Sequence, residues 1–321
     1  MPKVSVIVAV YKVENYIERC LHTLFSQTLD DIEYIFVDDA SPDNSMNILE
    51  RVLEKYPHRK SQVKIIRHSE NRGVALARTN GILAATGEYM IHCDPDDYVD
   101  IDMYELMYDE AIKENSDIIF CDYIKHKKEV NSLISMNFKE VSIDYLRKPI
   151  YNGYISTLWN VLVKSEIIKK NNLLPFPKGD VGEDLALILR ILYFSSTFKC
   201  LHKPFYHYCQ REDSIANGSS EIEKLRKFHI NIEGLINFYG NNKVYRKHCD
   251  YLKLNIKLET RKAFKENEKA WFNIYRDADR RILTIPREPL KTRILWSILL
   301  SNFMVYKFGC KIFKLIIGRP L

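Results

Sequence analysis

The sequence predicts a doubly wound α/β fold, in which helices cover both faces of a mostly parallel sheet, with a helical extension at the C-terminal end. First, β-branched apolar runs alternate with stretches of helical periodicity through about the first 120 residues. Second, acidic turns follow several of these runs, where the strands are expected to end. Third, the chain beyond residue 221 has almost only helical patterns. An α/β body followed by a helical region accounts for all three observations.

The elements of the α/β body follow one another in a regular order. Residues 4–10 are nearly all β-branched and apolar, as expected for a strand buried on both faces of a parallel sheet. The next segment predicts a helix whose apolar stripe is formed by Ile17, Leu21, Leu24 and Phe25. The alternation continues with strands at 33–37, 63–66 and 89–92, helices at 45–55 and 75–85, and a helix–strand unit from Met103 to Phe120. Sheets of this kind bind ligands at the carboxyl ends of their strands.

The second half of the chain is organised differently. Beyond residue 125 the pattern loosens into mixed strand and loop, and residues 185–194 then predict a helix. The turn-rich sequence Asn217-Gly218-Ser219-Ser220 precedes the helical patterns that begin at Glu221. We therefore predict a first domain at residues 1–217 and a mostly helical region at 218–321, which includes a basic amphipathic tail at about 291–321.

Composition limits the class of protein. Hydrophobic residues make up 46% and charged residues 28% of the 321 positions, which indicates an ordered globular chain. The seven cysteines include no Cys-x-x-Cys pair, which indicates reduced thiols and argues against a zinc site. The N-terminus enters a strand pattern at once, without the features of a secretory signal. We therefore expect a cytoplasmic protein.

The net charge of +6 is unevenly distributed. Residues 291–321 contain six basic residues and no acidic one, whereas the remainder holds 42 basic and 42 acidic residues. A nucleic-acid-binding body would need a basic face of its own, so we expect no nucleic acid among the partners.

The segment Asp94-Pro95-Asp96-Asp97 places three carboxylates directly after a short apolar strand. Carboxylates packed this closely repel one another unless a metal ion, a basic partner or water compensates their charge. The segment is either a solvated acidic turn or a site for a hard divalent cation. Its position at a strand end favours the cation site.

Two other strand ends carry candidate ligands. Tyr11 follows the first strand, and Asp38 and Asp39 end the second. Both aspartates could cap the next helix; we favour a structural role for Asp38 and a ribose or base contact for Asp39. The sequence contains neither Gly-x-Gly-x-x-Gly nor a P-loop, so the charge of a pyrophosphate would have to be met by a cation and arginines.

A series of short motifs, taken in order, resembles family 2 glycosyltransferases over about the first 215 residues. The series consists of Val4 to Tyr11, Ser26-Gln27-Thr28, Val37-Asp38-Asp39-Ala40-Ser41-Pro42-Asp43, Asn71-Arg72-Gly73 with Ala77-Arg78-Thr79-Asn80-Gly81, Gly87-Glu88-Tyr89, Asp94-Pro95-Asp96-Asp97, Gly182-Glu183-Asp184, and Tyr206-x-Tyr208-x-x-Arg211-x-x-Ser214. The resemblance implies a GT-A fold, a nucleoside diphosphate sugar as donor, Mn or Mg as cofactor, and transfer of a hexosyl-type sugar with inversion. Ala40, Lys12 and Pro95 depart from the glycine, asparagine and small residue that are usual at their positions, and Ala40 and Pro95 raise a question about turn geometry.

The resemblance also implies roles for individual residues. Ala9, Tyr11 and Asp39 would line the base and ribose, and Asp94 would accept from the ribose. Asp96 of the Asp-x-Asp motif would coordinate the cation, and Asp97 would be a further ligand or a residue beside the ligands. The remaining donor-binding positions are Asn71, Arg78, Arg211 and Ser214, of which the two arginines would neutralise the diphosphate.

An inverting transfer also needs a carboxylate that takes the proton of the attacking hydroxyl. Asp184, with Glu183 beside it, opens a predicted helix and is our candidate for this base. The alternative is that the two acids only complement the helix dipole.

The tail poses a separate question. Residues 294–306 are uncharged, which is too short a stretch to span a bilayer. On a helix, Lys307, Lys311 and Lys314 share one face, as in interfacial helices that bind anionic lipid. We expect peripheral contact with the inner face of the membrane; the alternative is a helix packed on the body or in a homodimer.

The sequence therefore predicts an inverting, metal-dependent glycosyltransferase of surface glycan synthesis that uses a nucleoside diphosphate sugar, with UDP as the expected nucleotide, and a glycan or lipid-linked acceptor. A sugar nucleotidyltransferase is the nearest enzymatic alternative, but it normally has a glycine-rich loop after its first strand. A catalytically silent scaffold that binds sugar nucleotides is the non-enzymatic alternative.

Overall fold

A computed structural model describes residues 1–127, 130–136, 156–210, 220–264, 267–284 and 290–307. The chain divides into two compact units, the first formed by Met1–Arg147 with Tyr154–Gly218 and the second by Lys148–Gly153 with Ser219–Leu321. The domain boundary predicted between residues 217 and 218 lies outside the described residues and stays a prediction.

The first unit is built on one sheet, in which the described strands follow the order β3-β2-β1-β4-β8-β6-β9-β5, with β7 paired to β6. β1 (Val4–Val10) lies parallel to β2 (Ile32–Asp38) and β4 (Tyr89–His92), and β2 lies parallel to β3 (Val63–Arg67). The strands 33–37, 63–66 and 89–92 of the prediction are therefore present within one or two residues of their expected bounds.

Antiparallel strands are confined to the other half of the sheet. β8 (Val161–Lys164) runs antiparallel to both β4 and β6 (Ile118–Lys127), while β6 lies parallel to β9 (Phe198–Cys209). The short strands β5 (Tyr98–Val99) and β7 (Val130–Ile134) pair antiparallel with β9 and β6. The predicted α/β class with a mostly parallel central sheet is confirmed, and the mixed pairing belongs to the region where the sequence pattern loosens.

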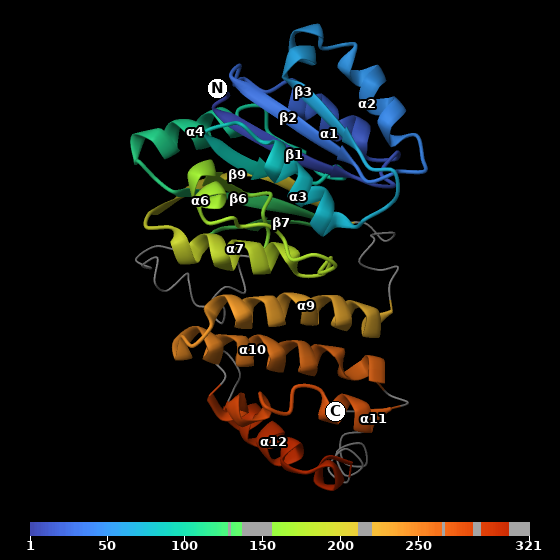
Figure 1. The fold of residues 1–321 in the computed structure, drawn as a ribbon, viewed down its shortest axis with the longest axis vertical. Coiled ribbons are helices and arrows are strands. Elements are labelled where there is room, and N and C mark those ends of the chain that lie inside the picture. Colours follow the sequence, from blue (N-terminus) through green and yellow to red (C-terminus); the bar gives the residue numbers. More distant parts are fainter. Residues whose placement is uncertain (128–129, 137–155, 211–219, 265–266, 285–289, 308–321) are drawn as a thin grey trace. The chain divides into compact units, whose positions relative to one another are not determined.

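Helices cover both faces of this sheet (Figure 1). The face that carries the even-numbered valines of β1 packs on α1 (Ile17–Phe25), α2 (Ser45–Leu53) and α4 (Met103–Lys113). The opposite face receives α3 (Val74–Ala84), whose Gly81 lies so close to β1 that an added Cβ would be 2.3 Å from Cγ2 of Ile7. α6 (Ser165–Lys170) and α7 (Glu183–Phe194) complete the helices of this unit among the described residues.

The second unit is helical where it is described, with α9 (Glu221–Tyr239), α10 (Lys243–Glu259), α11 (Glu268–Asn273) and α12 (Leu290–Ser301). Ser220, Asn242 and Asn267 cap the first three of these helices with side-chain oxygens. Its core contains Trp271, Phe272 and Tyr306, and α12 contributes Leu299 and Leu300. Within the described residues no helix is long and apolar enough to cross a membrane.

Candidate active site

The register of the parallel strands brings three strand ends to one edge of the sheet. Val10 lies opposite Asp38, Asp38 lies opposite Arg67, and Ile7 lies opposite His92. The residues that follow these positions along the chain are therefore neighbours at the carboxyl edge, where a doubly wound sheet binds its ligands. Tyr11, Asp39, His68 and Asp94 all reach this edge.

Asp39 organises the loop between β3 and α3. Its carboxylate accepts hydrogen bonds from the backbone N–H of Arg72 at 2.8 Å and of Gly73 at 2.9 Å. The side chains of Asn71 and His68 contact the same two oxygens at 2.9 and 2.7 Å. Four partners match the acceptor capacity of one carboxylate. The predicted ligands Asp39 and Asn71 therefore lie together, and Asp39 must release a partner in order to accept from a nucleotide.

The turns beside this edge adopt unusual backbone angles. Ala40 and Lys12 both have φ of 54°, in the left-handed region that favours glycine. The question raised by Ala40 thus has a structural answer, because Ala40 takes the strained conformation, and Lys12 takes it as well. Ser41 stabilises both turns, since its N–H donates to Asp38 at 2.8 Å and its hydroxyl oxygen accepts from the N–H of Lys12 at 2.9 Å.

Ala9 and Tyr11 lie at the end of β1. Ala9 pairs with Val37 of β2 and is partly exposed. Tyr11 is half-buried, and Nζ of Lys12 lies 5.2 Å from its ring centroid. The backbone N–H of Asp39 donates to the carbonyl of Val10 at 3.0 Å, so Tyr11 and Asp39 follow neighbouring strand ends.

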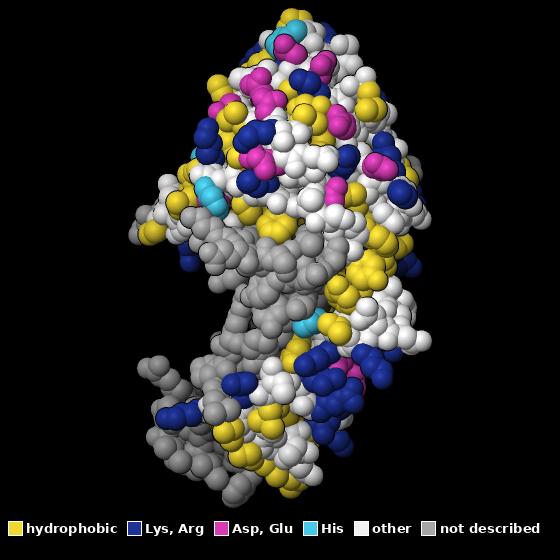
Figure 2. All heavy atoms as spheres, turned by 90° about the vertical axis from the view of Figure 1, so that its left-hand side faces the viewer, with side chains coloured by type: hydrophobic (Ala, Val, Ile, Leu, Met, Phe, Trp, Pro, Cys, Tyr) yellow, Lys and Arg dark blue, Asp and Glu magenta, His cyan; other side chains and the backbone are white. Residues whose placement is uncertain are grey.

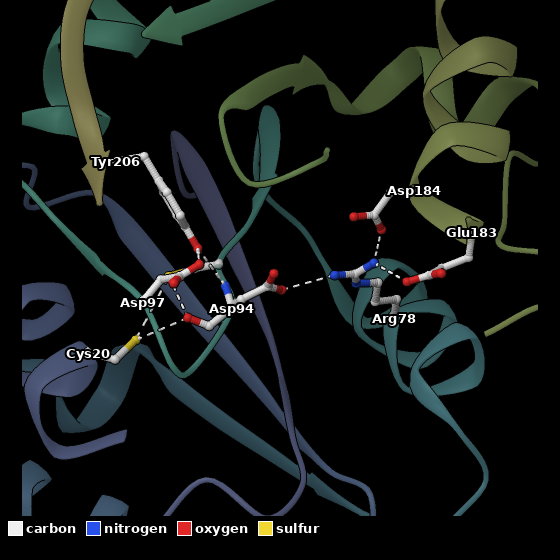
Figure 3. Close-up of polar contacts among 8 residues, drawn as sticks. Cys20, Arg78, Asp94, Asp97, Glu183, Asp184 and Tyr206 are labelled. Carbon is white, nitrogen blue, oxygen red and sulfur yellow. Dashed lines mark hydrogen bonds and ion pairs between the residues drawn. The ribbon is translucent and has the colours of Figure 1, made fainter. Parts of the chain in front are cut away.

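Arg78 of α3 connects Asp94 to the predicted base (Figure 3). Its Nη2 donates to Oδ1 of Asp94 at 2.9 Å, and its Nη1 donates to Glu183 at 2.6 Å and to Asp184. Segments more than 100 residues apart in the chain therefore meet at one guanidinium. Burial alone would lower the pKa of Arg78, but the charges of Asp94 and Glu183 outweigh it and raise that pKa above its ordinary value.

The charges around Arg78 also affect its neighbours. Burial raises the pKa of Glu183 above its ordinary value, despite the opposing effect of Arg78. Burial, together with the nearby charge of Arg78, holds the pKa of His92 well below its usual range. His92 at the end of β4 is therefore neutral, and Asp184 is the more exposed of the two candidate base carboxylates.

The two adjacent acids of the Asp94 turn differ in their surroundings. Asp97 is buried, and its oxygens accept from the hydroxyl of Tyr206 and from the backbone N–H of Cys209, both at 2.7 Å. Burial and the charges of Asp96 and Asp94 raise the pKa of Asp97 well above its usual range. A cation bound by Asp97 would have to displace one of these hydrogen bonds from β9.

Asp96 is partly exposed, and its backbone carbonyl accepts from Nη2 of Arg19 at 3.3 Å. Among the described residues no three His, Cys, Asp or Glu side chains converge to form a complete metal site. Hard cations such as Mg²⁺ bind one or two carboxylates and take their remaining ligands from phosphate oxygens and water. The partly exposed carboxylate of Asp96 is a donor of the type that such a cation binds.

The structure adds Tyr206 to the candidate site. Its hydroxyl donates to Asp97 and accepts from the backbone N–H of Asp94 at 3.1 Å, so it holds the acidic turn in one conformation. Tyr206 belongs to the motif Tyr206-x-Tyr208 that was part of the family resemblance, which is the signal that could have identified it. Two predicted donor-binding residues, Arg211 and Ser214, lie outside the described residues.

Comparison with known sequences identifies a family and several relatives. Residues 5–166 match the glycosyl transferase family 2. The putative glycosyltransferase EpsH of Bacillus subtilis is 34% identical over 215 residues, which are 64% of this chain and 60% of EpsH. The cholesterol galactosyltransferase of Borreliella burgdorferi is 29% identical over 252 residues, which are 74% of this chain and 68% of that protein. The chain thus spans about three fifths of the length of EpsH.

Comparison with solved structures extends over nearly the whole chain. The Staphylococcus aureus TarS fragment 1–349, solved in complex with UDP-GlcNAc, matches with a TM-score of 0.69. The match covers 96% of this chain and 92% of the TarS fragment at 20% sequence identity. At that identity the likeness shows a shared fold.

Proposed function

Since the chain belongs to glycosyl transferase family 2, we propose that it transfers a sugar, with inversion, from a UDP-sugar to a hydroxyl of a glycan or lipid-linked acceptor. The predicted GT-A fold is confirmed by the likeness to TarS, which was solved with UDP-GlcNAc. The relatives include a cholesterol galactosyltransferase, whose name supports a lipid-linked acceptor. Synthesis of a surface glycan is the process that we propose for this activity.

The observation that carries the proposal is the shared contact of Arg78 with Asp94 and Asp184. Asp94 belongs to the acidic turn that would meet the ribose and diphosphate, while Asp184 is the proposed base. One guanidinium contacts both, so the donor and the attacking hydroxyl would lie within a few ångströms of each other, as a single displacement requires.

In the proposed reaction the acceptor hydroxyl oxygen forms a bond to the anomeric carbon while the bond from that carbon to the diphosphate breaks. Asp184 takes the hydroxyl proton, with Glu183 beside it, and the diphosphate leaves with the electron pair of the broken bond. Arg78 pairs with Asp184 in the described arrangement, so this contact would have to open before Asp184 accepts the proton. A bound diphosphate would offer Arg78 another anion in place of Asp184.

A divalent cation, Mn or Mg, would stabilise the developing charge on the leaving diphosphate. Asp96 is the residue proposed to hold it, because its side chain is partly exposed in a turn fixed by Tyr206 and Arg19. Asp97 would support this turn through its hydrogen bonds with Tyr206 and Cys209 of β9. Tyr11, Ala9 and Asn71 would line the base and ribose beside Asp39. Arg211 is proposed for the diphosphate, and Ser214 for donor binding, on the family resemblance alone.

A thermal-shift screen of nucleoside diphosphate sugars, each with and without Mn, tests the donor. A ligand that binds only the folded state stabilises it by RT ln(1 + [L]/Kd), and therefore raises Tm. We expect one UDP-sugar to raise Tm only in the presence of the cation. Equal shifts without the cation would contradict the role of Asp96, and no shift with any sugar nucleotide would contradict the donor class.

Two variants test the division of roles within the site. Asp184→Asn should abolish transfer but keep the cation-dependent thermal shift, whereas Asp96→Ala should lose both. Asp109→Asn, an exposed aspartate on α4, is the control and should behave as the unmodified protein. If the unmodified protein binds the sugar nucleotide but transfers no sugar, a silent scaffold is favoured. If it releases pyrophosphate from a sugar phosphate and UTP, it is a nucleotidyltransferase.

We also propose that the second unit contacts the inner face of an anionic membrane. Residues 219–321 contain 22 basic and 10 acidic residues, and Figure 2 shows Lys and Arg side chains gathered beside apolar ones in this part of the chain. α12 and the turn of helix after it expose Ile294, Leu295, Ile298, Met304 and Val305, while Lys291 and Lys307 are exposed on the same segment. Lys311 and Lys314 of the predicted basic face lie outside the described residues.

The face of this segment opposite the exposed apolar stripe packs in the core of the second unit, so the segment could bind a surface without unfolding. Leu299, Leu300 and Tyr306 are buried in the core of the second unit, so that face packs within the unit. An apolar stripe flanked by lysines is typical of interfacial helices on anionic lipid. The alternative to membrane binding is a homodimer formed through the same apolar stripe.

Sedimentation with vesicles tests the membrane proposal. Ile298→Asp should reduce binding to vesicles that contain phosphatidylglycerol, and Val244→Asp is the matched control because Ile298 and Val244 are both 55% exposed. Equal binding of both variants would overturn the proposal. Loss of a dimer in Ile298→Asp without a change in vesicle binding would favour the homodimer.

A further inference from the structure

The N-terminus of α3 is capped by a residue that lies more than 100 positions further along the chain. The position before the helix is Gly73, which has no side chain, and the first turn Val74-Ala75-Leu76-Ala77 contains no acid. Oδ1 of Asp180 accepts the backbone N–H of Ala75 at 3.2 Å. This carboxylate thus supplies both the acceptor and the negative charge that a helix N-terminus favours.

Gly73 makes room for this carboxylate. Its φ of 88° lies in the region that glycine adopts most readily. A Cβ on Gly73 would lie 2.4 Å from Oδ1, 2.7 Å from Oδ2 and 2.8 Å from Cγ of Asp180, and these are the three atoms nearest to it. The close approach of Asp180 therefore depends on a glycine at this position.

The residues after Asp180 carry the proposed base. Gly182 has φ of 77° and precedes α7, whose first two residues are Glu183 and Asp184. Glu183 and Asp184 contact Arg78, which lies three positions after Ala75 on α3. Segment 180–184 is therefore attached to α3 at two points one turn apart, and two attachments fix an orientation that a single one would leave free to rotate.

The same helix end is attached to the nucleotide side. The backbone N–H of Gly73 donates to Asp39 at 2.9 Å, and Asp39 also holds Asn71 and Arg72. The N-terminus of α3 is thus fixed by Asp39 on one side and by Asp180 on the other. A displacement of this helix end would change the distance between the nucleotide-binding loop and the proposed base.

We propose that Asp180 is a positioning residue, which with Gly73 holds segment 180–184 on α3 so that Asp184 meets the acceptor hydroxyl. The inference rests on the proposed function, since it assigns to Asp180 the placement of the proposed base. Small displacements of a reacting group reduce rates strongly, by up to about 100-fold for 1 Å. Asp180 therefore acts on turnover rather than on donor affinity.

Asp180→Ala should lower kcat by about 10- to 100-fold while the KM for the donor changes by less than about 3-fold. Asp180→Asn keeps the accepting oxygen but loses the charge, so it should recover most of kcat. Ser220→Ala is the matched control, because it removes a helix-capping hydrogen bond of the same length, 3.2 Å, in the second unit. Ser220→Ala should lower Tm without lowering kcat.

A pair of variants tests the contact itself. Gly73→Ala should reduce kcat because the added Cβ displaces the carboxylate of Asp180. Once Asp180→Ala has removed that carboxylate, the only remaining effect of Gly73→Ala should be the strain of its backbone conformation. The double variant should therefore have a kcat no lower than that of the slower single variant, whereas two independent effects would multiply.

Unchanged kcat in Asp180→Ala, or multiplying effects in the double variant, would overturn the inference even if Asp184→Asn abolishes transfer. Full transfer activity of Asp184→Asn would instead overturn the proposed base. A drop in kcat for Ser220→Ala equal to that for Asp180→Ala would show that any lost helix cap has this effect, and would also overturn the inference.

Discussion

Nη2 of Arg78 on α3 lies 2.9 Å from Oδ1 of Asp94, directly after strand β4. The contact joins a helix on one face of the sheet to the acidic turn at its carboxyl edge. The same guanidinium also pairs with Glu183 at 2.6 Å and with Asp184. Three carboxylates therefore depend on one buried cation.

Arg78→Ala should lower the free energy of unfolding by about 3–5 kcal/mol, because it leaves the buried Glu183 without its charged partner. Arg78→Lys should recover only part of this loss, since one ammonium cannot reproduce the fork of the guanidinium. Urea unfolding measures both. The control is Arg51→Ala, which breaks an exposed ion pair with Glu18 and should cost about 1 kcal/mol or less. Equal losses at Arg78 and Arg51 would contradict the prediction.

Asp96 and Asp97 should respond differently to amide substitution. Asp97→Asn removes one acceptor from the clamp with Tyr206 and Cys209, and should lower the free energy of unfolding by about 1–3 kcal/mol. Asp96→Asn should leave stability nearly unchanged but weaken the response to Mn in the thermal-shift assay. A normal Mn response in Asp96→Asn, combined with its loss in Asp97→Asn, would identify Asp97 as the cation ligand.

Glu33 should make the stability of the sheet depend on pH. Burial by itself would raise its pKa, but hydrogen bonds from Lys64, Ser5 and Thr86 outweigh burial and lower the pKa of Glu33 to about 2. Because this pKa is depressed in the folded state, the stabilisation is fully present above about pH 4.5 and is lost as pH falls toward about 2.

The measurement is the free energy of unfolding of the unmodified protein and of Glu33→Gln between pH 6 and pH 2. The advantage of the unmodified protein should shrink as the pH falls through this range. A constant difference across the range would show that Glu33 does not titrate with a depressed pKa.

Lys257 and Asp279 form a buried ion pair in the second unit, with Nζ 2.8 Å from Oδ1. Burial lowers the pKa of Lys257 and raises that of Asp279, so the charge of Lys257 depends on Asp279, which also pairs with the exposed Arg276 at 2.6 Å. Asp279→Asn should cost about 3–5 kcal/mol, whereas the double variant Lys257→Met with Asp279→Leu should be close to neutral. Unfolding followed by tryptophan fluorescence is suitable, because Nζ lies 5.4 Å from the ring centroid of Trp271. A double variant less stable than Asp279→Asn would contradict this.

The α/β body and the sheet edge that carries the candidate site follow from the sequence pattern. The strand at 4–10 could be predicted from its nearly continuous β-branched run, and those at 63–66 and 89–92 from short apolar runs that alternate with helical patterns, all of which are local properties. Parallel order then brought Tyr11, Asp39 and Asp94 to the same edge. The helix at 185–194 was also predicted, and it begins two residues earlier than expected.

Tertiary structure decided which partner each of these side chains has. The sequence contains Arg78, Asp180 and Glu183, but their contacts join α3 to a segment about 105 residues away, and no local pattern encodes that approach. In the same way, burial against Tyr206 distinguishes Asp97 from the adjacent Asp96, although both are aspartates of one turn. Local periodicity is sufficient to form the strands, whereas the charge and hydrogen bonding of a site depend on which distant segments pack together.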